Sequence, residues 1–310
     1  MYSTPFAGVS GCKVTKKIAN FAGNMGKESM TLNMGGRLSD IRRPAVMGIV
    51  NATPDSFYAM SRAGGAEAGR RALQMVRQGA DIIDVGAYST RPGAREIDAD
   101  TEYDRLAPAL ESIIRAVPGT PLSVDTFRAS VADRCIENFG PMIINDVGGT
   151  TLDPEIGRVA ADRHVPYILM HMRGTPATMS TLTDYDDVVA DVLEDLVRKA
   201  DALTQIGVAD VILDPGFGFA KTVAQNYELL AALPQFEATG YPVLVGISRK
   251  TMIWKPLGIT ADQAINGTTV LNTIALLRGA DILRVHDVAE AVQARKLVSL
   301  LKAESRDSQL

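Results

Sequence analysis

Cysteine is scarce in this chain, and so are the features that would attach a protein to a membrane. The 310 residues include only two cysteines, Cys12 and Cys135, which do not have the spacing of a metal site. We therefore expect a reducing compartment and no disulfide framework. No apolar run approaches the roughly 18 residues of a membrane-spanning helix, and the N-terminus lacks the compact apolar core of a secretory signal. The sequence predicts a cytoplasmic protein with no membrane partner.

The chain also has no large excess of charge of either sign. Its formal net charge is -4, from 32 basic and 36 acidic residues, which does not favour a nucleic-acid partner or an anionic membrane surface. Hydrophobic residues make up 46% and charged residues 22%, the composition of an ordinary globular protein. A small anionic substrate remains compatible with this balance, because a local cationic pocket does not require a basic protein.

The first 45 residues differ in pattern from the rest. Residues 1–28 have no clear periodicity and are predicted to be a disordered leader. Four lysines among serine and threonine make a weak targeting segment the less favoured alternative, and Met25 or Met30 could be the true start. Residues 31–38 alternate around Gly35-Gly36, which predicts a small hairpin. No linker composition follows residue 45, so residues 29–310 are expected to form one domain.

Short apolar runs with polar endings recur from residue 46 onward. Amphipathic helical segments separate them, as at residues 66–78, 101–117, 187–206 and 261–278. Eight such units imply a parallel sheet, and eight strands close a (β/α)8 TIM barrel. The rival, a doubly wound open sheet, would have a glycine-rich fingerprint where this chain has Asn51-Ala52-Thr53-Pro54. The predicted strands are 46–51, 81–86, 121–125, 142–146, 166–171, 210–214, 242–248 and 281–286.

Polar side chains end almost every predicted strand, and active sites of such barrels lie at that end. Taken singly, an Asp or Asn there is more often a turn former or a helix cap. Groups at all eight ends of one rim favour a functional site instead. The second strand contributes through the loop with Thr90, Arg91 and Pro92. The other rim residues are Asn51, Asp125, Asn145, Asp146, His171, Asp214, Ser248, Arg249, Lys250, Arg284 and His286.

The rim combines two chemistries. Asp125, Asn145 and Asp214 are acceptors, expected to be half-buried, which suit a ring with adjacent N–H donors such as an aminopyrimidinone edge. A second set of rim residues, here called the cationic group, suits phosphate or pyrophosphate. A ring with N–H donors joined to a phosphate ester would engage both sets. The cationic group consists of Arg91, Lys250, Arg284 and His286.

Some rim residues have a more ordinary interpretation. His171 is interpreted as a histidine at the edge of the core, satisfied by a backbone partner, rather than as a catalytic group. Arg249 is expected to point outward or to form a structural pair. Trp254 is expected to pack against a helix.

Eight motifs, in order and at family spacing, resemble dihydropteroate synthase over residues 45–300. The resemblance includes Ser248-Arg249-Lys250 and the Pro215-Gly216-Phe217-Gly218-Phe219 loop. It implies a transferase of folate biosynthesis that joins 6-hydroxymethyl-7,8-dihydropterin pyrophosphate to p-aminobenzoate, giving 7,8-dihydropteroate and pyrophosphate. The motifs span residues 48–57, 89–93, 123–126, 145–146, 170–174, 214–219, 248–250 and 284–288.

The resemblance also implies a role for each matching residue. Pyrophosphate leaves first, and a pterin methylene cation forms. Pterin binding is implied for Asp125, Asn145, Asp214 and Lys250; pyrophosphate binding for Arg284, His286 and Arg91; and p-aminobenzoate binding for Phe219, Ser248, Lys250, Thr90 and Pro92. Asn51 would help bind Mg²⁺ with the pyrophosphate. Catalysis is assigned to Asp125, Asp214, Lys250, Arg284 and His286. The family further implies a homodimer and a sulfonamide target.

The segments after the first two predicted strands depart from the family pattern. Ala59 and Met60 stand in place of an acidic residue and a glycine, and Tyr88 replaces a glutamate. One rival hypothesis is a pterin-dependent methyltransferase on the same barrel, which would have no reason to keep Arg284 with His286. The other is a catalytically inactive folate-binding subunit, which loss of a rim residue would mark.

Overall fold

Eight parallel strands close into a barrel in the computed structural model, which describes residues 29–52, 62–88 and 96–307. Their order is β8-β7-β6-β5-β4-β3-β10-β9, and the pairing of Leu213 with Val243 brings β8 beside β9. The predicted barrel is confirmed, although the run at 242–248 contains only a two-residue strand. The strands are β3 (Ala45–Asn51), β4 (Ile82–Gly86), β5 (Leu122–Asp125), β6 (Ile143–Asp146), β7 (Tyr167–Met170), β8 (Val211–Asp214), β9 (Leu244–Val245) and β10 (Ile282–Val285).

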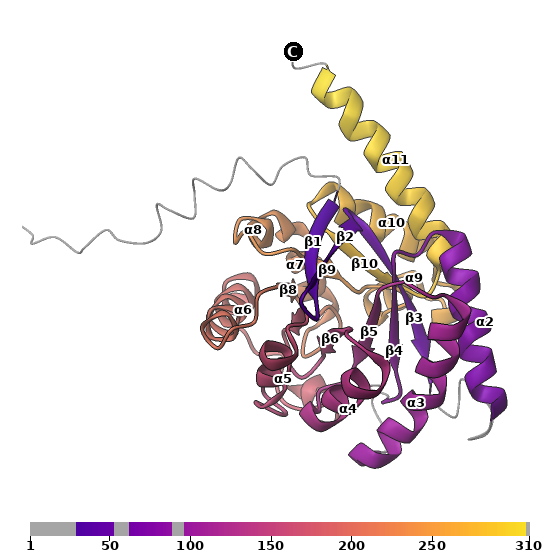
Figure 1. Ribbon diagram of the computed structural model, residues 1–310. Coiled ribbons are helices and arrows are strands. Elements are labelled where there is room, and N and C mark those ends of the chain that lie inside the picture. The colour runs from indigo at the N-terminus through magenta and orange to yellow at the C-terminus, as the bar shows by residue number, and fades with distance from the viewer. Residues whose placement is uncertain (1–28, 53–61, 89–95, 308–310) are drawn as a thin grey trace, which may run out of the picture.

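Helices surround the strands, and α11 projects beyond the others (Figure 1). Three predicted helices are found with small shifts of their ends, whereas the segment 261–278 divides into η3 and α10. Asp98, Asp187 and Thr222 cap α3, α6 and α7 by accepting backbone N–H groups. The helices are α2 (Arg62–Gln78), α3 (Ala99–Ala116), α4 (Ala129–Phe139), α5 (Ile156–Arg163), η2 (Met179–Thr181), α6 (Val188–Gln205), α7 (Val223–Ala231), α8 (Leu233–Glu237), α9 (Thr251–Leu257), η3 (Ala261–Gln263), α10 (Ile265–Leu277) and α11 (Val288–Asp307). In the described part of the chain, none of them is long and apolar enough to span a membrane.

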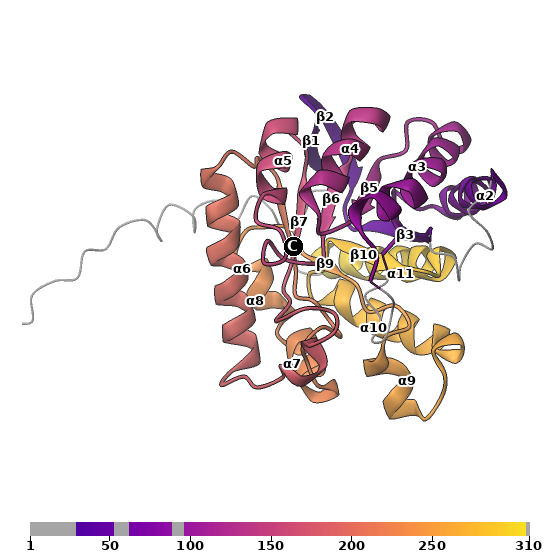
Figure 2. The same cartoon turned by 90° about the horizontal axis from the view of Figure 1, so that it is seen from below.

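The predicted hairpin is also found, and it closes one end of the barrel (Figure 2). It consists of β1 (Ser29–Met34) and β2 (Arg37–Arg42), joined by Gly35 and Gly36 at positive φ. Its apolar side chains belong to the inner core of the barrel, separate from the larger core between strands and helices. This inner core consists of Met30, Leu32, Ile41, Ala45, Met47, Ile82, Ile143, Ile168, Ile212, Leu244 and Ile282.

The closed end is the one where the strands begin. Asp81, Asp210 and Asp281 precede β4, β8 and β10, and each carboxylate accepts a backbone N–H from a neighbouring strand or from the hairpin. Polar groups there are used to hold the backbone together. A ligand must therefore approach from the opposite end, where the strands finish. The predicted leader, residues 1–28, lies outside the described residues.

Candidate active site

Arg284 is the centre of a polar network at the C-terminal end of the strands. From β10, its Nε donates to Oδ2 of Asp84 (2.7 Å) on β4, and its Nη2 donates to Oδ2 of Asp125 (2.5 Å) on β5. Nδ2 of Asn145 on β6 lies 3.3 and 3.4 Å from the two oxygens of Asp84. Four strands thus bring four polar side chains together inside the mouth of the barrel.

The acceptors are more deeply buried than the half-burial expected from the sequence. Asn145 is 2% and Asp214 5% exposed, while the side chain of Asp125 is 18% exposed. Burial raises the pKa of Asp125 to about 7, although the charge of Arg284 opposes the shift. Burial also raises the pKa of Asp214. These carboxyl groups lack the solvation that water would give them, so a ligand with N–H donors can satisfy them.

The β8–α7 loop forms the neighbouring wall and contacts Lys250. Oδ1 of Asp214 accepts the N–H of Gly216 at 2.8 Å. Nζ of Lys250 donates to the carbonyl oxygen of Phe217 and lies 4.5 Å from the ring centroid of Phe219. Burial lowers the pKa of Lys250 to about 8. Two motifs of the family resemblance, this loop and Ser248-Arg249-Lys250, are therefore in direct contact.

In the Ser-Arg-Lys turn, Arg249 lies between the two site residues Ser248 and Lys250 and has a left-handed backbone conformation. Arg249 has a φ of +57°, and its Nε and Nη2 donate to Oδ2 and Oδ1 of Asp287 at 2.9 and 2.7 Å. This is the structural pair expected for Arg249. On the other side, Oγ of Ser248 lies 3.1 Å from Nδ1 of His286 and accepts its backbone N–H at 3.2 Å. Burial lowers the pKa of His286 to about 4, so the ring is neutral at pH 7.

Known proteins with the same sequence pattern bind pterins. The family model described as pterin binding enzyme matches residues 47–286. Dihydropteroate synthase from Synechocystis is 42% identical over 269 residues, which cover 84% of this chain and 91% of the relative. The Escherichia coli enzyme is 40% identical over 276 residues, covering 87% and 95%. The chain belongs to the dihydropteroate synthase family.

Solved structures of dihydropteroate synthases agree in fold as well. The Xanthomonas albilineans enzyme with 4-aminobenzoic acid has a TM-score of 0.81 at 39% identity, covering 89% of this chain and 99% of its own. A Yersinia pestis enzyme with a sulfonamide drug complex has a TM-score of 0.80 at 37% identity, covering 88% and 100%. The family and fold implied by the motifs are confirmed, and the synthase hypothesis is favoured over the methyltransferase and the inactive subunit.

The structure brings together most of the predicted site residues of this synthase. Thr90, Arg91 and Pro92 lie outside the described residues. Asn51 ends β3 and is half-buried. The predicted residues that meet at the C-terminal mouth are Asp125, Asn145, Asp214, Phe219, Ser248, Lys250, Arg284 and His286. Their individual roles in the reaction remain predictions.

Two buried charged residues of the site were missed. Asp84 is fully buried, and its only sequence signal was a carboxylate within an apolar run. Lys221 lies within the β8–α7 loop, and its Nζ lies 2.9 Å from Nδ1 of His171. His171 is therefore at the core edge as expected, but its ring contacts a lysine. Tyr88, one of the departures from the family pattern, packs edge to face on Phe127 at a centroid distance of 5.1 Å.

Proposed function

We propose that the network around Arg284 is where this dihydropteroate synthase joins dihydropterin pyrophosphate to p-aminobenzoate. The observation that carries the proposal is the set of buried acceptors, Asp125, Asn145 and Asp214, beside two desolvated cations, Arg284 and Lys250. An aminopyrimidinone edge presents adjacent N–H donors, which suit carboxylate acceptors. Donors of this kind favour the ionised form of Asp125, whose pKa burial raises to about 7 without a ligand.

The leaving pyrophosphate would be met by Arg284 and His286. Among the described residues, Nη1 of Arg284 has no hydrogen-bond partner, since Asp84 and Asp125 engage Nε and Nη2. When the hydroxyl of Ser248 donates to Nδ1 of His286, the neutral ring carries its proton on Nε2 and can donate from there. Both donors are fixed before the reaction, so they would stabilise charge as it develops on the phosphate oxygens.

Bond breaking before bond making fits the acidic surroundings. The C–O bond of the substrate breaks with its electron pair going to pyrophosphate, which leaves positive charge delocalised over the pterin ring. Asp125 and Asp214 lie where carboxylates can stabilise that charge. The amine of p-aminobenzoate then forms the new C–N bond and releases a proton. Exclusion of water by the barrel wall would protect the cation until that step.

The donor set suits a magnesium ion that is held mainly by the substrate. No group of three or more His, Cys, Asp or Glu side chains within residues 29–52, 62–88 and 96–307 could hold a metal. Asn51 nevertheless offers an amide oxygen at the end of β3, and Mg²⁺ commonly combines one or two protein oxygens with phosphate oxygens. Bound there, Mg²⁺ would neutralise charge on the pyrophosphate.

The p-aminobenzoate site would lie beside Phe219, Ser248 and Lys250. Thr90 and Pro92, which the resemblance also assigns to it, lie outside the described residues. The Xanthomonas relative is described with 4-aminobenzoic acid and the Yersinia relative with a sulfonamide drug complex. By this similarity, sulfonamides should compete with p-aminobenzoate here. A cytoplasmic location agrees with these small soluble substrates.

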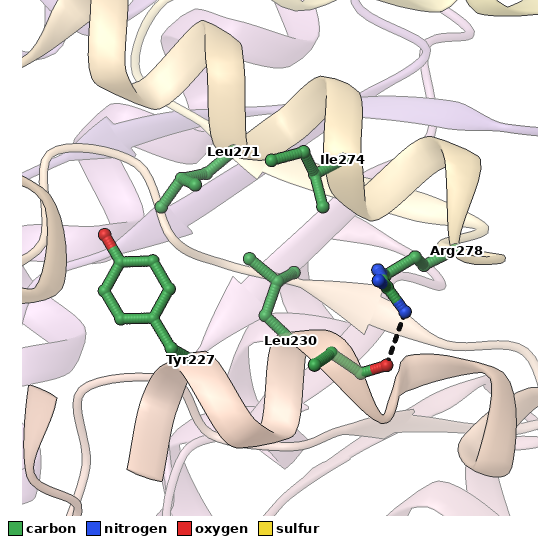
Figure 3. Close-up of a pocket in the computed structure, with 6 residues that line it drawn as sticks. Tyr227, Leu230, Leu271, Ile274 and Arg278 are labelled. Carbon is green, nitrogen blue, oxygen red and sulfur yellow. Dashed lines mark hydrogen bonds between the residues drawn. The ribbon is translucent and has the colours of Figure 1, made fainter. Parts of the chain in front are cut away.

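A second copy of this chain is the proposed protein partner. A pocket of about 140 Å³ lies between α7 and α10 and is lined by Tyr227, Leu230, Ala231, Leu271, Ile274 and Arg278 (Figure 3). Val270 and Leu277 on α10 are 50% and 47% exposed, and Leu297 and Leu300 on α11 are 68% and 66% exposed. Apolar exposure concentrated on successive helices supports a homodimer through this face. Sedimentation of the parent and of Leu277→Asp would test it.

The reaction itself is tested by incubating the purified protein with dihydropterin pyrophosphate, p-aminobenzoate and Mg²⁺. We expect pyrophosphate and 7,8-dihydropteroate to appear together, and both to be lost on adding a chelator and restored by excess Mg²⁺. Product formation that is insensitive to the chelator would overturn the magnesium proposal alone. Absence of product with all three components would overturn the proposed site.

A further inference from the structure

A buried ammonium lies beneath the β8–α7 loop, and the proposed chemistry does not use it. Lys221 is only 8% exposed. Its Nζ lies 3.1 Å from the carbonyl oxygen of Gly216, 3.0 Å from that of Phe219 and 2.9 Å from Nδ1 of His171. Burial lowers the pKa of Lys221 to about 7, so the ammonium form prevails below pH 7. That form has three N–H donors and no acceptor. Each donor therefore has one acceptor, and the lysine is satisfied entirely within the protein.

His171 is the acceptor that comes from another strand. It follows β7 and is 2% exposed. Because an ammonium can only donate, Nδ1 of His171 must accept, which fixes the neutral tautomer with its proton on Nε2. Burial, helped by the charge of Lys221, lowers the pKa of His171 to about 2, in keeping with a neutral ring. The pair thus connects β7 to the loop after β8.

The loop that this pair holds has an unusual backbone. Gly216 and Gly218 have φ values of +71° and +80°, and Ala220 has a φ of +50°. A Cβ at Gly216 would lie 2.0 Å from the carbonyl oxygen of His171, so only glycine fits against β7 there. Such a backbone requires contacts that select it over less strained alternatives. Lys221, in the same loop, supplies two of them, at the carbonyl oxygens of Gly216 and Phe219.

The outer side of the same loop contacts Lys250. The carbonyl oxygen of Phe217 accepts from Nζ of Lys250, and the ring of Phe219 lies beneath it. A Cβ at Gly218 would lie 3.1 Å from Cδ of Lys250, so the stem of Lys250 also rests on the loop. A shift of the loop would therefore displace both Phe219 and the ammonium of Lys250. Asp125 and Asn145, on β5 and β6, have no contact with it in the hydrogen-bond network described above.

We propose that Lys221 and His171 form a buried positioning pair that fixes the β8–α7 loop and, through it, sets the affinity for p-aminobenzoate. The inference rests on the proposed roles of Phe219 and Lys250. Neither Lys221 nor His171 touches a substrate in this scheme. Pterin binding shares Asp214 and Lys250 with the loop but keeps Asp125, Asn145 and Arg284, which have no hydrogen bond to it, so it should respond less.

The first test compares Lys221→Met with the control Lys255→Met, at an exposed lysine on α9. Losing charged hydrogen bonds that hold one loop should raise KM for p-aminobenzoate about tenfold. KM for dihydropterin pyrophosphate should change by no more than about threefold, and the control should match the parent. An equal rise in both KM values, or a fall in kcat alone, would mean that Lys221 only supports folding and would overturn the proposal.

A second series guards against a Lys221→Met variant that does not fold. His171→Asn keeps an acceptor near the position of Nδ1, whereas His171→Leu removes it. We expect the p-aminobenzoate KM to stay near the parent value in the first variant and to rise in the second. Equal KM values in the two variants would overturn the role of the Lys221–His171 contact.

A measurement without substrate separates this inference from the proposed function. In the ligand-free parent, ¹⁵N NMR of His171 should show an unprotonated Nδ1 and a protonated Nε2 throughout pH 5.5–6.5, where Lys221 is protonated. A His171 that titrates in that range, or carries its proton on Nδ1, would overturn the pair even in an active enzyme. If the parent made no dihydropteroate, the proposed function would fail while this signal still reported on the loop.

Discussion

The two ends of this barrel use the same residue type in opposite ways. Where the strands begin, the carboxylates of Asp81, Asp210 and Asp281 accept backbone N–H groups of Val46, Asn33 and Val243, at 2.8, 2.6 and 2.8 Å. Where the strands finish, Asp84 and Asp125 share the guanidinium of Arg284 and accept no backbone N–H from the described residues. Position along the strand, rather than the residue itself, decides whether an aspartate holds the fold together or prepares a site.

Arginine repeats the contrast. Arg295 at the closed end donates to Asp81 and lies 3.3 Å from the carbonyl oxygen of Pro44, so all its contacts connect α11 to the start of the sheet. Arg284 at the open end is shared by Asp84 and Asp125, and burial raises the pKa of Asp125 to about 7. The closed end is locally satisfied, whereas the open end keeps an excess of acceptors that a ligand can complete.

Removing the shared cation should have the largest effect. Arg284→Ala leaves Asp84 and Asp125 buried without a cation, and we expect a loss of about 3–5 kcal/mol in the free energy of unfolding. The variant also loses a donor to the leaving group, so kcat/KM should fall about a thousandfold. Urea unfolding and steady-state kinetics at a temperature where the variant is folded measure the two effects.

Arg295→Ala is the matched variant at the closed end. It also removes a buried arginine from an aspartate, Asp81, so a loss of stability is expected there too. Its kcat/KM should equal that of the parent once the protein is folded. A comparable loss of kcat/KM in Arg295→Ala would refute the division of labour between the two ends.

The apolar core at the closed end should affect stability alone. Leu32 is 2% exposed and packs inside the barrel with Met47 and Ile282. Leu32→Ala should lower the free energy of unfolding by about 2–5 kcal/mol through lost burial and a cavity. Denaturant titration gives this value. At 25 °C the folded fraction should keep its kcat and both KM values, and a selective change in either KM would show that the hairpin communicates with the rim.

The sequence could predict those parts of this contrast that depend on contacts between residues close together in the chain. Strand number and order followed from local runs and the helices between them, because each βα unit is nearly complete in its own 30 or so residues. The hairpin was predicted from Gly35-Gly36. Its place inside the barrel was not, because that depends on contacts with strands far along the chain.

The missed site residues show the same limit. A strand buried on both faces has no alternation, so nothing in Ile83-Asp84-Val85 tells which way Asp84 points. Lys221 and His171 are 50 positions apart and meet only because β7 and β8 are neighbours. Rim residues at strand ends were found more easily, since the end of a strand can be read locally while its partners cannot.

Substitution of Lys250 should separate the effect on activity from the effect on stability better than substitution of Arg284 does. Its ammonium donates to a backbone carbonyl, that of Phe217, so Lys250→Ala does not separate a directly bonded carboxylate pair. We expect kcat/KM to fall about a hundredfold, with a change in melting temperature of only a few degrees. Steady-state kinetics and thermal unfolding of the same preparation measure both. Kinetics like those of the Lys255→Ala control would show that Lys250 is not part of the site.

The smallest expected effect concerns acid stability and His171. Burial lowers the pKa of His171 to about 2, so the folded protein keeps the ring neutral while the unfolded chain binds a proton below about pH 6.5. The unfolded state then binds more protons than the folded state. The free energy of unfolding therefore rises with pH in this range. His171 should therefore destabilise the parent progressively as pH falls below about 6.5, by about 2 kcal/mol at pH 5.

The contribution of His171 can be isolated by comparing the free energy of unfolding of the parent with that of a variant without the histidine. Burial raises the pKa of Asp125 to about 7 and that of Asp146 to about 6, so both acids favour the folded state as pH falls and oppose the histidine. His171→Asn keeps both acids and removes the titrating ring. The free energy of unfolding of the parent, relative to His171→Asn, should thus decrease by about 2 kcal/mol between pH 7 and pH 5 in urea titrations. A difference that stays constant over this range would mean that His171 accepts a proton in the folded protein, and that its neutral contact with Lys221 is not maintained.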